Sequence, residues 1–351
     1  MVLLWDGVLI PVPCIQKEII MDRYERVQAA LAGKPVDRVP VSAWGHFYEK
    51  ETTAEGLADA MLSFQNRYDW DFLKIHARAS YHVEGWGFTY IPSLSPDKPH
   101  QTLHHPIKSV NDWKKLRPLS SEIEPFREQL KAIELIRKGL KEKIPVLMTV
   151  FSPLDIAEKL VDRDTKLLQN HLLEDPEAVG AGLAAISETF EGFISKLRSV
   201  GIDGIYFSTK WANRKRMTAN GYRDLALFHD LRVLKATRDF WITILHLCEG
   251  PIYLQELSDY PVHVFHWDHT QSGNPTFAEG KRLVSAAVSG GVDSKTLAEG
   301  NEVEVERKVR EVLEETRGHH FLLGPGCSIV TAKTPEANLM AMRKAAEKYG
   351  N

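Results

Sequence analysis

The sequence predicts an α/β fold of the (β/α)8 TIM-barrel class with an irregular N-terminal part. Between Val39 and Cys327, eight short apolar runs rich in β-branched residues alternate with helical stretches. Such runs are typical of parallel strands that are buried on both faces of a sheet. Eight strand–helix units in roughly 300 residues fit a barrel better than a doubly wound sheet, because no G-x-G-x-x-G follows the first strand. The runs are "VPVSAW", "DFLKIH", "PVLMTVF", "GIYFST", "WITILHL", "VHVFHWD", "LVSAAVSGGV" and "HFLLGPGC".

The first 20 residues do not fit this pattern. They begin with apolar residues but have no basic segment, and Pro11 and Pro13 interrupt them, so they do not predict a signal peptide. Met21 then opens "MDRYERVQAALAGK", which has the spacing of an amphipathic helix. We expect residues 1–20, which include Cys14, to be a loose or misassigned extension. Residues 21–351 are expected to form a single barrel domain.

Two further helices are predicted with clear limits. The segment from Asp175 to Val200 has a long amphipathic pattern that ends near Gly201, and Glu302 to Thr316 has another. The stretch between Ile75 and Ile144 is longer than a strand–helix unit needs, and we expect it to form excursions over the barrel mouth. No linker, low-complexity segment or short-period repeat divides the chain.

Composition narrows the classes of partner. Lys and Arg number 44 against 47 Asp and Glu, so no basic excess is available to neutralise nucleic-acid phosphates. No apolar stretch approaches the ~18 residues that a membrane-spanning helix needs. Three cysteines are too few for a disulfide framework, which favours a reducing compartment. We therefore expect a cytoplasmic protein that binds neither nucleic acid nor membrane.

Polar side chains stand at the ends of most predicted strands. Because the carboxyl ends of barrel strands form the face on which active sites lie, we expect these side chains to converge there. The residues at these positions are His46, His76, His246, Cys248, Glu249, Asp268, Asp293 and Cys327. The strand ends therefore predict one polar face at the barrel mouth.

His246 and Cys248, in "HLCEG", are one residue apart at the end of a strand, so both side chains lie on the same side of the pleat. Cys327 follows the turn "GPG" at the end of the last strand, 79 residues further on (327 minus 248). Imidazole and thiolates are zinc ligands, and three of them with an open fourth position are typical of catalytic zinc. Such a metal could deprotonate a substrate thiol or activate water. The alternative is that these cysteines are small, buried apolar fillers.

From about Met21 to Gly350 the sequence resembles the uroporphyrinogen decarboxylase superfamily. Three segments carry the resemblance: "YERVQAALAGKPVDRVPV", "GGVDSKTLAEGNEVEVERKV" and "FLLGPGCSIVTAKTPEANLMAM". The resemblance implies the barrel fold with a site at its mouth. It does not choose the reaction, because the superfamily holds both decarboxylases and methyltransferases.

The motifs of the decarboxylase branch are missing at four places. Its arginine-rich R-Q-A-G-R is replaced by "SAWGHFYEKE", and the aspartate after its second strand is replaced by "IHARAS". Its tyrosine in a G-P-W-T-like context corresponds to "VFSPLDIAEKL", and the histidine of its G-H-G is replaced by Pro325 in "GPGC". These departures weigh against decarboxylation of a tetrapyrrole, which stays an alternative.

The cobalamin-dependent methyltransferases of the methylcobamide:coenzyme M type are resembled more closely. Their His-x-Cys and later Cys match His246, Cys248 and Cys327, and "GCSIVTAKTPEANL" matches their G-C-x-I and T-P-x-x-N-L. The resemblance implies that these three residues bind zinc and are catalytic. It also implies that a thiol such as coenzyme M receives a methyl group from methylcobalamin.

This chain has no D-x-H-x-x-G corrinoid motif, since the spacing in "HWDHTQSG" does not match, so the methylcobalamin is expected on a partner corrinoid protein. Asp268, His46, His76 and Glu249 are the candidates for substrate binding. A folate acceptor and a corrinoid- or tetrapyrrole-binding accessory without turnover are further alternatives. The expected partners are the corrinoid protein and a small thiol or folate, with a homodimer as one option for the assembly.

Overall fold

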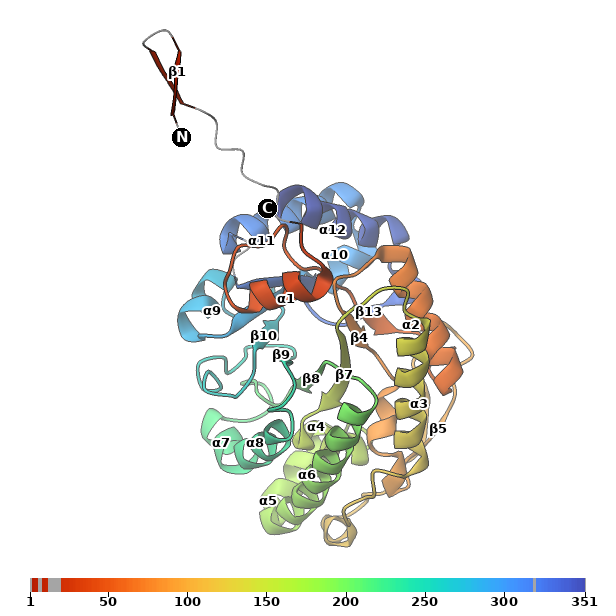
Figure 1. Cartoon of the computed structure of the whole chain (residues 1–351). Coiled ribbons are helices and arrows are strands. Elements are labelled where there is room, and N and C mark those ends of the chain that lie inside the picture. Colours follow the sequence, from red (N-terminus) through yellow and green to blue (C-terminus); the bar gives the residue numbers. More distant parts are fainter. Residues whose placement is uncertain (1, 6–7, 12–19, 318–319, 351) are drawn as a thin grey trace.

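The computed structural model describes residues 2–5, 8–11, 20–317 and 320–350. Cys14 lies outside the described residues. Within them, the predicted TIM barrel is confirmed: seven parallel strands form one curved sheet in which each strand pairs with the next along the chain (Figure 1). These strands are β4 (Leu73–Ile75), β7 (Val146–Phe151), β8 (Gly204–Thr209), β9 (Ile242–Leu247), β10 (Val264–Trp267), β11 (Ala287–Val292) and β12 (Phe321–Pro325).

The first predicted run, residues 39–44, closes the sheet into a barrel, although it forms only a single bridge. Val41 pairs in parallel with Leu323 of β12. On its other side, the carbonyl oxygen of Val41 accepts a hydrogen bond of 2.9 Å from the backbone N–H of Asp71, just before β4. All eight predicted runs therefore lie around the same barrel.

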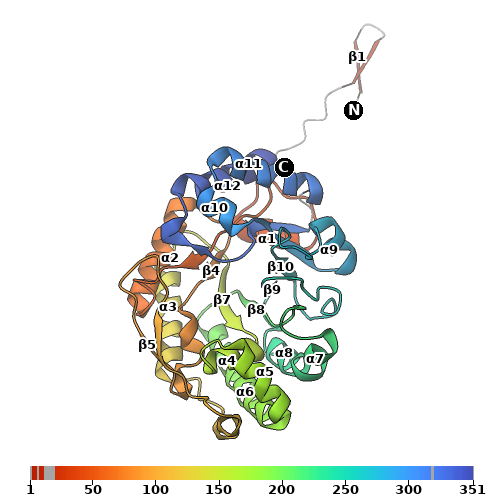
Figure 2. The same cartoon turned by 180° about the vertical axis from the view of Figure 1, so that it is seen from behind.

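Helices surround the barrel (Figures 1 and 2). They are α2 (Ala54–Tyr68), α3 (Glu124–Gly139), α4 (Pro153–Leu160), α5 (Thr165–Glu174), α6 (Pro176–Ser199), α7 (Ala219–Leu225), α8 (Leu227–Lys235), α9 (Phe277–Leu283), α10 (Ser294–Glu299), α11 (Glu302–Thr316) and α12 (Glu336–Tyr349). α6 and α11 confirm the two helices whose limits were predicted. No described helix combines the length and apolar character that crossing a bilayer requires.

One strand–helix unit differs from the prediction. The described residues 248–263, between β9 and β10, form turns and no helix. Pro251 and Pro261 leave only nine residues between them, and each proline removes a backbone donor, so a helix of ordinary length does not fit there. The loop after β9, which carries Cys248, is therefore held by turns and side chains.

Short elements cover the two ends of the barrel. α1 (Arg23–Leu31) lies across the amino end, where Val27 is fully buried against side chains of the lumen. The long stretch before α3 forms an antiparallel hairpin and three short 3-10 helices. The short elements are β3 (Gly45–His46), β5 (Thr89–Ile91), β6 (Gln101–His104), β13 (Ile329–Val330), η1 (Ala79–His82), η2 (Glu84–Trp86), η3 (Val110–Lys115) and η4 (Thr331–Lys333). Two further strands, β1 (Val2–Trp5) and β2 (Val8–Pro11), pair only with each other and do not cover the barrel.

The lumen changes from apolar to polar toward the carboxyl ends of the strands. Along β9, Ile242 and Ile244 belong to the apolar cluster that fills the lumen, and His246 follows at the next inward position. Along β10, Val264 lies in the same cluster and His266 follows. The side chains that face the lumen therefore become polar at the level of His246 and His266.

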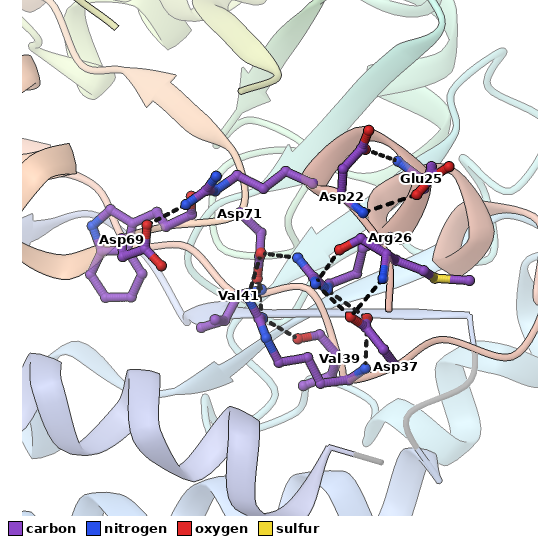
Figure 3. Close-up of polar contacts among 12 residues, drawn as sticks. Asp22, Glu25, Arg26, Asp37, Val39, Val41, Asp69 and Asp71 are labelled. Atoms are coloured by element: carbon purple, nitrogen blue, oxygen red, sulfur yellow. Dashed lines mark hydrogen bonds and ion pairs between the residues drawn. The ribbon is translucent and has the colours of Figure 1, made fainter. Parts of the chain in front are cut away.

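A buried carboxylate, that of Asp71, holds the closing segment in place (Figure 3). Its oxygens accept hydrogen bonds from Arg26 of α1, from Arg38 and from the backbone N–H of Val41, each with a contact of 2.8 Å. Arg26 also contacts Asp37 at 2.7 Å. The network joins α1, the first strand position and the start of β4.

We expect Asp71→Asn to lower the free energy of unfolding by about 3–5 kcal/mol, because the buried Arg26 and the half-buried Arg38 would lose a charged partner. Asp59→Asn is the matched control: Asp59 is exposed, 3.5 Å from Lys50, and should change stability by less than about 0.5 kcal/mol. Thermal and chemical unfolding of both variants measure the difference. Equal, small effects would contradict the proposed closing role of Asp71.

Candidate metal centre at the barrel mouth

The structure brings together His246, Cys248 and Cys327 from two strand ends. His246 lies in β9, Cys248 directly follows it, and Cys327 follows β12. The backbone N–H of Cys248 donates to the carbonyl of Thr209 at 2.9 Å, so the pattern of the sheet continues one residue beyond β9. The ligand atoms of the three side chains all lie within 4.8 Å of one another.

Two of the three separations between these atoms match a tetrahedral zinc site, and the third, between His246 and Cys248, is at most 4.8 Å. The two Sγ atoms are 3.8 Å apart, and Cys327 Sγ lies 3.6 Å from His246 Nε2. Around a tetrahedral zinc with Zn–S of about 2.3 Å and Zn–N of about 2.0–2.1 Å, two sulfurs lie about 3.8 Å apart and a sulfur and a nitrogen about 3.6 Å apart. The donor set and these two separations therefore suit zinc, and three protein ligands leave a tetrahedral ion one open position.

A second histidine fixes which nitrogen His246 presents. His266 Nε2 lies 2.8 Å from the carbonyl oxygen of Pro325, which only accepts, so this nitrogen carries a proton. Burial holds the pKa of His266 well below its usual value, so the ring is neutral and its Nδ1 accepts. His246 Nδ1 donates to that atom at 2.7 Å, and the Tyr206 hydroxyl donates at 3.1 Å. The Nε2 of His246 is left with a lone pair beside the sulfurs.

The two thiols are not equivalent in the absence of a metal. The hydrogen bond with Cys327 and burial raise the pKa of Cys248. The hydrogen bond from Cys248 lowers the pKa of Cys327 even though burial opposes this change. Cys327 is therefore the thiol that loses its proton more easily, and a divalent cation would displace the protons of the pair.

Asp268 lies beside the Cys327 loop, as the strand-end position predicted. A Cβ atom added at Gly326 would come within 2.7 Å of Asp268 Cγ, so only glycine lets the loop pass this close. The Asp268 carboxylate accepts from the N–H and hydroxyl of Thr270 at 3.0 and 2.7 Å and from Gln271 at 3.3 Å. It is buried at the mouth, and its substrate-binding role stays a prediction.

Glu249 and Asp293 are engaged by other residues of the mouth. The Glu249 carboxylate accepts from Arg216 at 3.1 and 3.2 Å. Asp293 caps α10 by accepting from the backbone N–H of Thr296 at 2.8 Å. The role of Glu249 in substrate binding stays a prediction.

His46 and His76 lie together at the mouth, after the first two predicted strands. Their rings meet edge to face with centroids 4.1 Å apart. Nδ1 of His46 contacts the Glu51 carboxylate at 2.9 Å, and Nδ1 of His76 accepts from Lys74 at 2.7 Å. Burial and the neighbouring charges of Lys74, His46 and His246 hold the pKa of His76 well below its usual value. His76 therefore connects the surroundings of the metal ligands to His46.

A cavity of about 230 Å³ opens beside His46. Its walls come from the mouth and from the excursion after β4. They are formed by His46, Tyr48, Glu51, Ala79, Ser80, Phe88, Tyr90, Pro99, His100, Thr102, Lys159 and Arg163. Burial raises the pKa of Glu51, but contacts with His100 and His46 more than offset this and bring it to about 2. Glu51 is therefore an anion held between two imidazoles.

Lys159 and Arg163 add positive charge to the cavity wall. The ammonium of Lys159 lies 3.5 Å from the centroid of the Phe151 ring, and it has no hydrogen bond or ion pair with another described residue. Burial lowers the pKa of Lys159 to about 7, although Asp155 opposes this. Arg163 is exposed at the rim.

Several of these residues were not predicted from the sequence. Lys74 and His266 were passed over inside the runs "DFLKIH" and "VHVFHWD" because a strand pattern was the stronger feature. A charged or titratable side chain at an inward position of a buried strand was the available signal. Tyr206, Lys159 and Arg163 gave no such signal, because each is ordinary in its local sequence.

Comparison with known proteins finds relatives that match most of this chain. The model of the uroporphyrinogen decarboxylase (URO-D) family matches residues 22–349. A methylcobamide:CoM methyltransferase, MtbA, from Methanosarcina mazei is 22% identical over 346 residues, covering 93% of this chain and 97% of its own length. A uroporphyrinogen decarboxylase from Sorangium cellulosum is 26% identical over 249 residues, which cover 68% of each chain.

Solved structures agree on the fold. A methyltransferase from Methanosarcina mazei superposes with a TM-score of 0.79 at 20% identity, covering 94% of this chain and 99% of its own. A B12-independent methionine synthase from Shewanella gives a TM-score of 0.59 at 15% identity, covering 89% and 97%. The barrel thus extends over nearly the whole chain in both comparisons.

Protein purified without chelators is expected to contain about one zinc per chain, and Cys248→Ser and Cys327→Ser should each lose most of it, because a hydroxyl is a poor zinc ligand. His266→Leu keeps all three ligands but removes the acceptor for His246 Nδ1, so zinc affinity should fall about 10–100-fold. Cys14→Ser, the same substitution at the remaining cysteine, is the control. Elemental analysis and competition with a chelator measure these values, and metal-free wild-type protein would refute the assignment.

Proposed function

Because this chain belongs to the uroporphyrinogen decarboxylase (URO-D) family, we propose that it is a zinc-dependent methyltransferase that moves a methyl group from a methyl-corrinoid protein to a small thiol. The observation that carries the proposal is the spacing of the His246, Cys248 and Cys327 ligand atoms, 3.8 Å between sulfurs and 3.6 Å from sulfur to nitrogen. Two thiolates, one imidazole and an open position suit a metal that binds a substrate thiol. The methylcobamide:CoM methyltransferase relatives support the same reading.

The residues of the chain prepare the acceptor for reaction. His266 keeps His246 in the tautomer that offers Nε2, and the two cysteines fix the position of the open site. A bound zinc ion would supply the Lewis acidity that keeps the acceptor as thiolate, which is the nucleophilic form. The partly buried position of the two cysteines limits the access of water and would keep the sulfur in place for attack on the methyl group. Methylcobalamin is expected on a separate corrinoid protein that docks at the mouth.

The cavity beside His46 supports a short acceptor with a negatively charged tail. Its volume of about 230 Å³ suits a small molecule, and Lys159 and Arg163 lie in its wall. Lys159 has no acidic side chain of the described residues within ion-pair distance, so an anion there would gain a partner. A thiol bearing a sulfonate or carboxylate therefore fits better than a neutral one.

Alternatives remain within the same family. A tetrapyrrole decarboxylase, a methyl transfer to folate and a corrinoid-binding accessory would not require the paired thiols, and the arrangement of Cys248 and Cys327 favours the thiol acceptor. Both are free thiols, which suits a reducing compartment such as the cytoplasm. A homodimer stays an option for the assembly.

Zinc-loaded protein mixed anaerobically with methylcobalamin is expected to form cob(I)alamin only when a thiol is present, because the acceptor sulfur must attack as thiolate. Cys327→Ser should lower the rate by about 100-fold or more, since it removes a metal ligand. Absorption spectroscopy follows cob(I)alamin, with ethylene glycol replacing 2-mercaptoethanol as the control acceptor. If no thiol in a broad panel accelerated demethylation by zinc-loaded wild-type protein, the proposal would fail.

Lys159→Met should raise KM for 3-mercaptopropionate by about tenfold, because it removes a buried positive charge from the cavity wall, and should leave KM for 2-mercaptoethanol within about twofold. The neutral 2-mercaptoethanol is the control for this variant, since the two thiols differ mainly in the charge of the tail. An equal change for both thiols would argue against an anion subsite at Lys159.

A further inference from the structure

A lysine occupies the lumen of the barrel at the level of the candidate metal centre. Lys74 is the middle residue of β4 and is only 2% exposed. Its Nζ donates to Nδ1 of His76 at 2.7 Å and lies 4.3 Å from the centroid of the Tyr206 ring. The Tyr206 hydroxyl in turn donates to His266, which orients His246. Lys74 thus lies on the wall that surrounds the metal ligands.

The charge of this lysine has no acidic partner in the part of the chain that the structure describes. No carboxylate forms an ion pair with it, and its contacts are an imidazole and the aromatic faces of Tyr206 and Trp44. Burial lowers the pKa of Lys74 to about 7, and the groups that oppose this are the thiols of Cys327 and Cys248. A buried ammonium without a counter-ion is costly, so the partner of this charge belongs to another state of the site.

The charge balance of the site identifies that state. A divalent ion with two thiolates and one neutral imidazole has no net charge. An acceptor thiolate in the fourth position gives the centre one negative charge in a buried, low-dielectric lumen, where a nearby cation is worth most. The methylated product is a neutral thioether, so the negative charge disappears when the methyl group arrives.

We propose that Lys74 is the cation that compensates the negative charge which an acceptor thiolate brings to the metal centre. This inference rests on the proposed function. Lys74 forms no covalent bond in this role: the thiol loses its proton to solvent, and the ammonium stabilises the anion that remains. The lysine therefore favours the bound thiolate over the bound thioether and assists release of the product.

A structural lysine would behave differently from a charge-compensating one. If Lys74 only filled the lumen or held His76 in place, its replacement would weaken every fourth ligand to a similar degree. Charge compensation affects a thiolate and spares a neutral ligand of the same shape. A thiol and its S-methyl ether separate the two roles.

The test uses full-length protein loaded with Co²⁺, whose thiolate charge-transfer absorption reports coordination of an added thiol. The probes are 2-mercaptoethanol, which has a neutral tail, and 2-(methylthio)ethanol as its competitor. Lys74→Met should retain about one metal per chain and raise the Kd of the thiol at least about tenfold, while the Kd of the thioether changes by less than about twofold. Ser289→Ala is the matched control, because Ser289 is a buried, uncharged residue that pairs with His266 in the neighbouring strand; it should change both Kd values by less than about twofold.

Lys74→Gln provides a second variant, since its amide can donate to His76 but carries no charge. It should weaken thiol binding as much as Lys74→Met does. Wild-type affinity in Lys74→Gln, or equal losses for thiol and thioether in Lys74→Met, would overturn charge compensation while leaving the proposed function intact. Failure of the wild-type cobalt protein to bind any thiol would instead overturn the proposed function and this inference with it.

Discussion

Closure of the barrel at its amino end is the constraint on which the geometry of the mouth depends. The first strand position contributes a single bridge, so backbone pairing alone ties it weakly between β12 and β4. The buried carboxylate of Asp71 supplies the missing links by binding Arg26, Arg38 and the backbone of Val41. At the other end of the same segment, β3 pairs with β13 immediately after Cys327. The segment thus fixes the position of the loop that carries the third candidate ligand.

Within the closed ring, a layer of polar side chains replaces the apolar filling usual in a barrel lumen. His246, His266 and Tyr206 form a hydrogen-bonded series in which each proton position follows from the Pro325 carbonyl. A neutral His266 is favoured there because burial penalises its charged form. This series holds His246 in one tautomer, which suits its proposed role as a metal ligand, and Lys74 is the cation proposed to compensate negative charge in the lumen.

The family shares one barrel between different reactions, and the side chains at the mouth choose among them. In this chain the mouth combines three sulfur and nitrogen donors with a cavity whose wall carries Lys159 and Arg163. His76 and His46 connect the two, since their rings are in contact and one of them lines the cavity. The proposed acceptor, with its sulfur at a bound metal and an anionic tail in the cavity, is consistent with this arrangement.

The sequence alone determined the barrel and the candidate ligands. Its eight apolar runs all became strand positions, because burial of such runs depends on local composition and on the helices between them. Its His-x-Cys pair lies on one side of a strand end through the two-residue period of the pleat, and a second strand end supplied Cys327. The two-residue period of a strand and the apolar composition of a run are properties of a single element, so the sequence of that element is enough to predict them.

Only the tertiary structure decided what these residues touch. The turn-rich loop between β9 and β10, the pairing of Glu249 with Arg216 and the orientation of His246 by His266 all depend on partners far apart in the sequence. In the sequence, Lys74 was one charge inside an apolar run, and only the closed lumen turned it toward Tyr206 and the metal ligands. The physical reason is that distances across a barrel are set by closure and register, which involve every strand together.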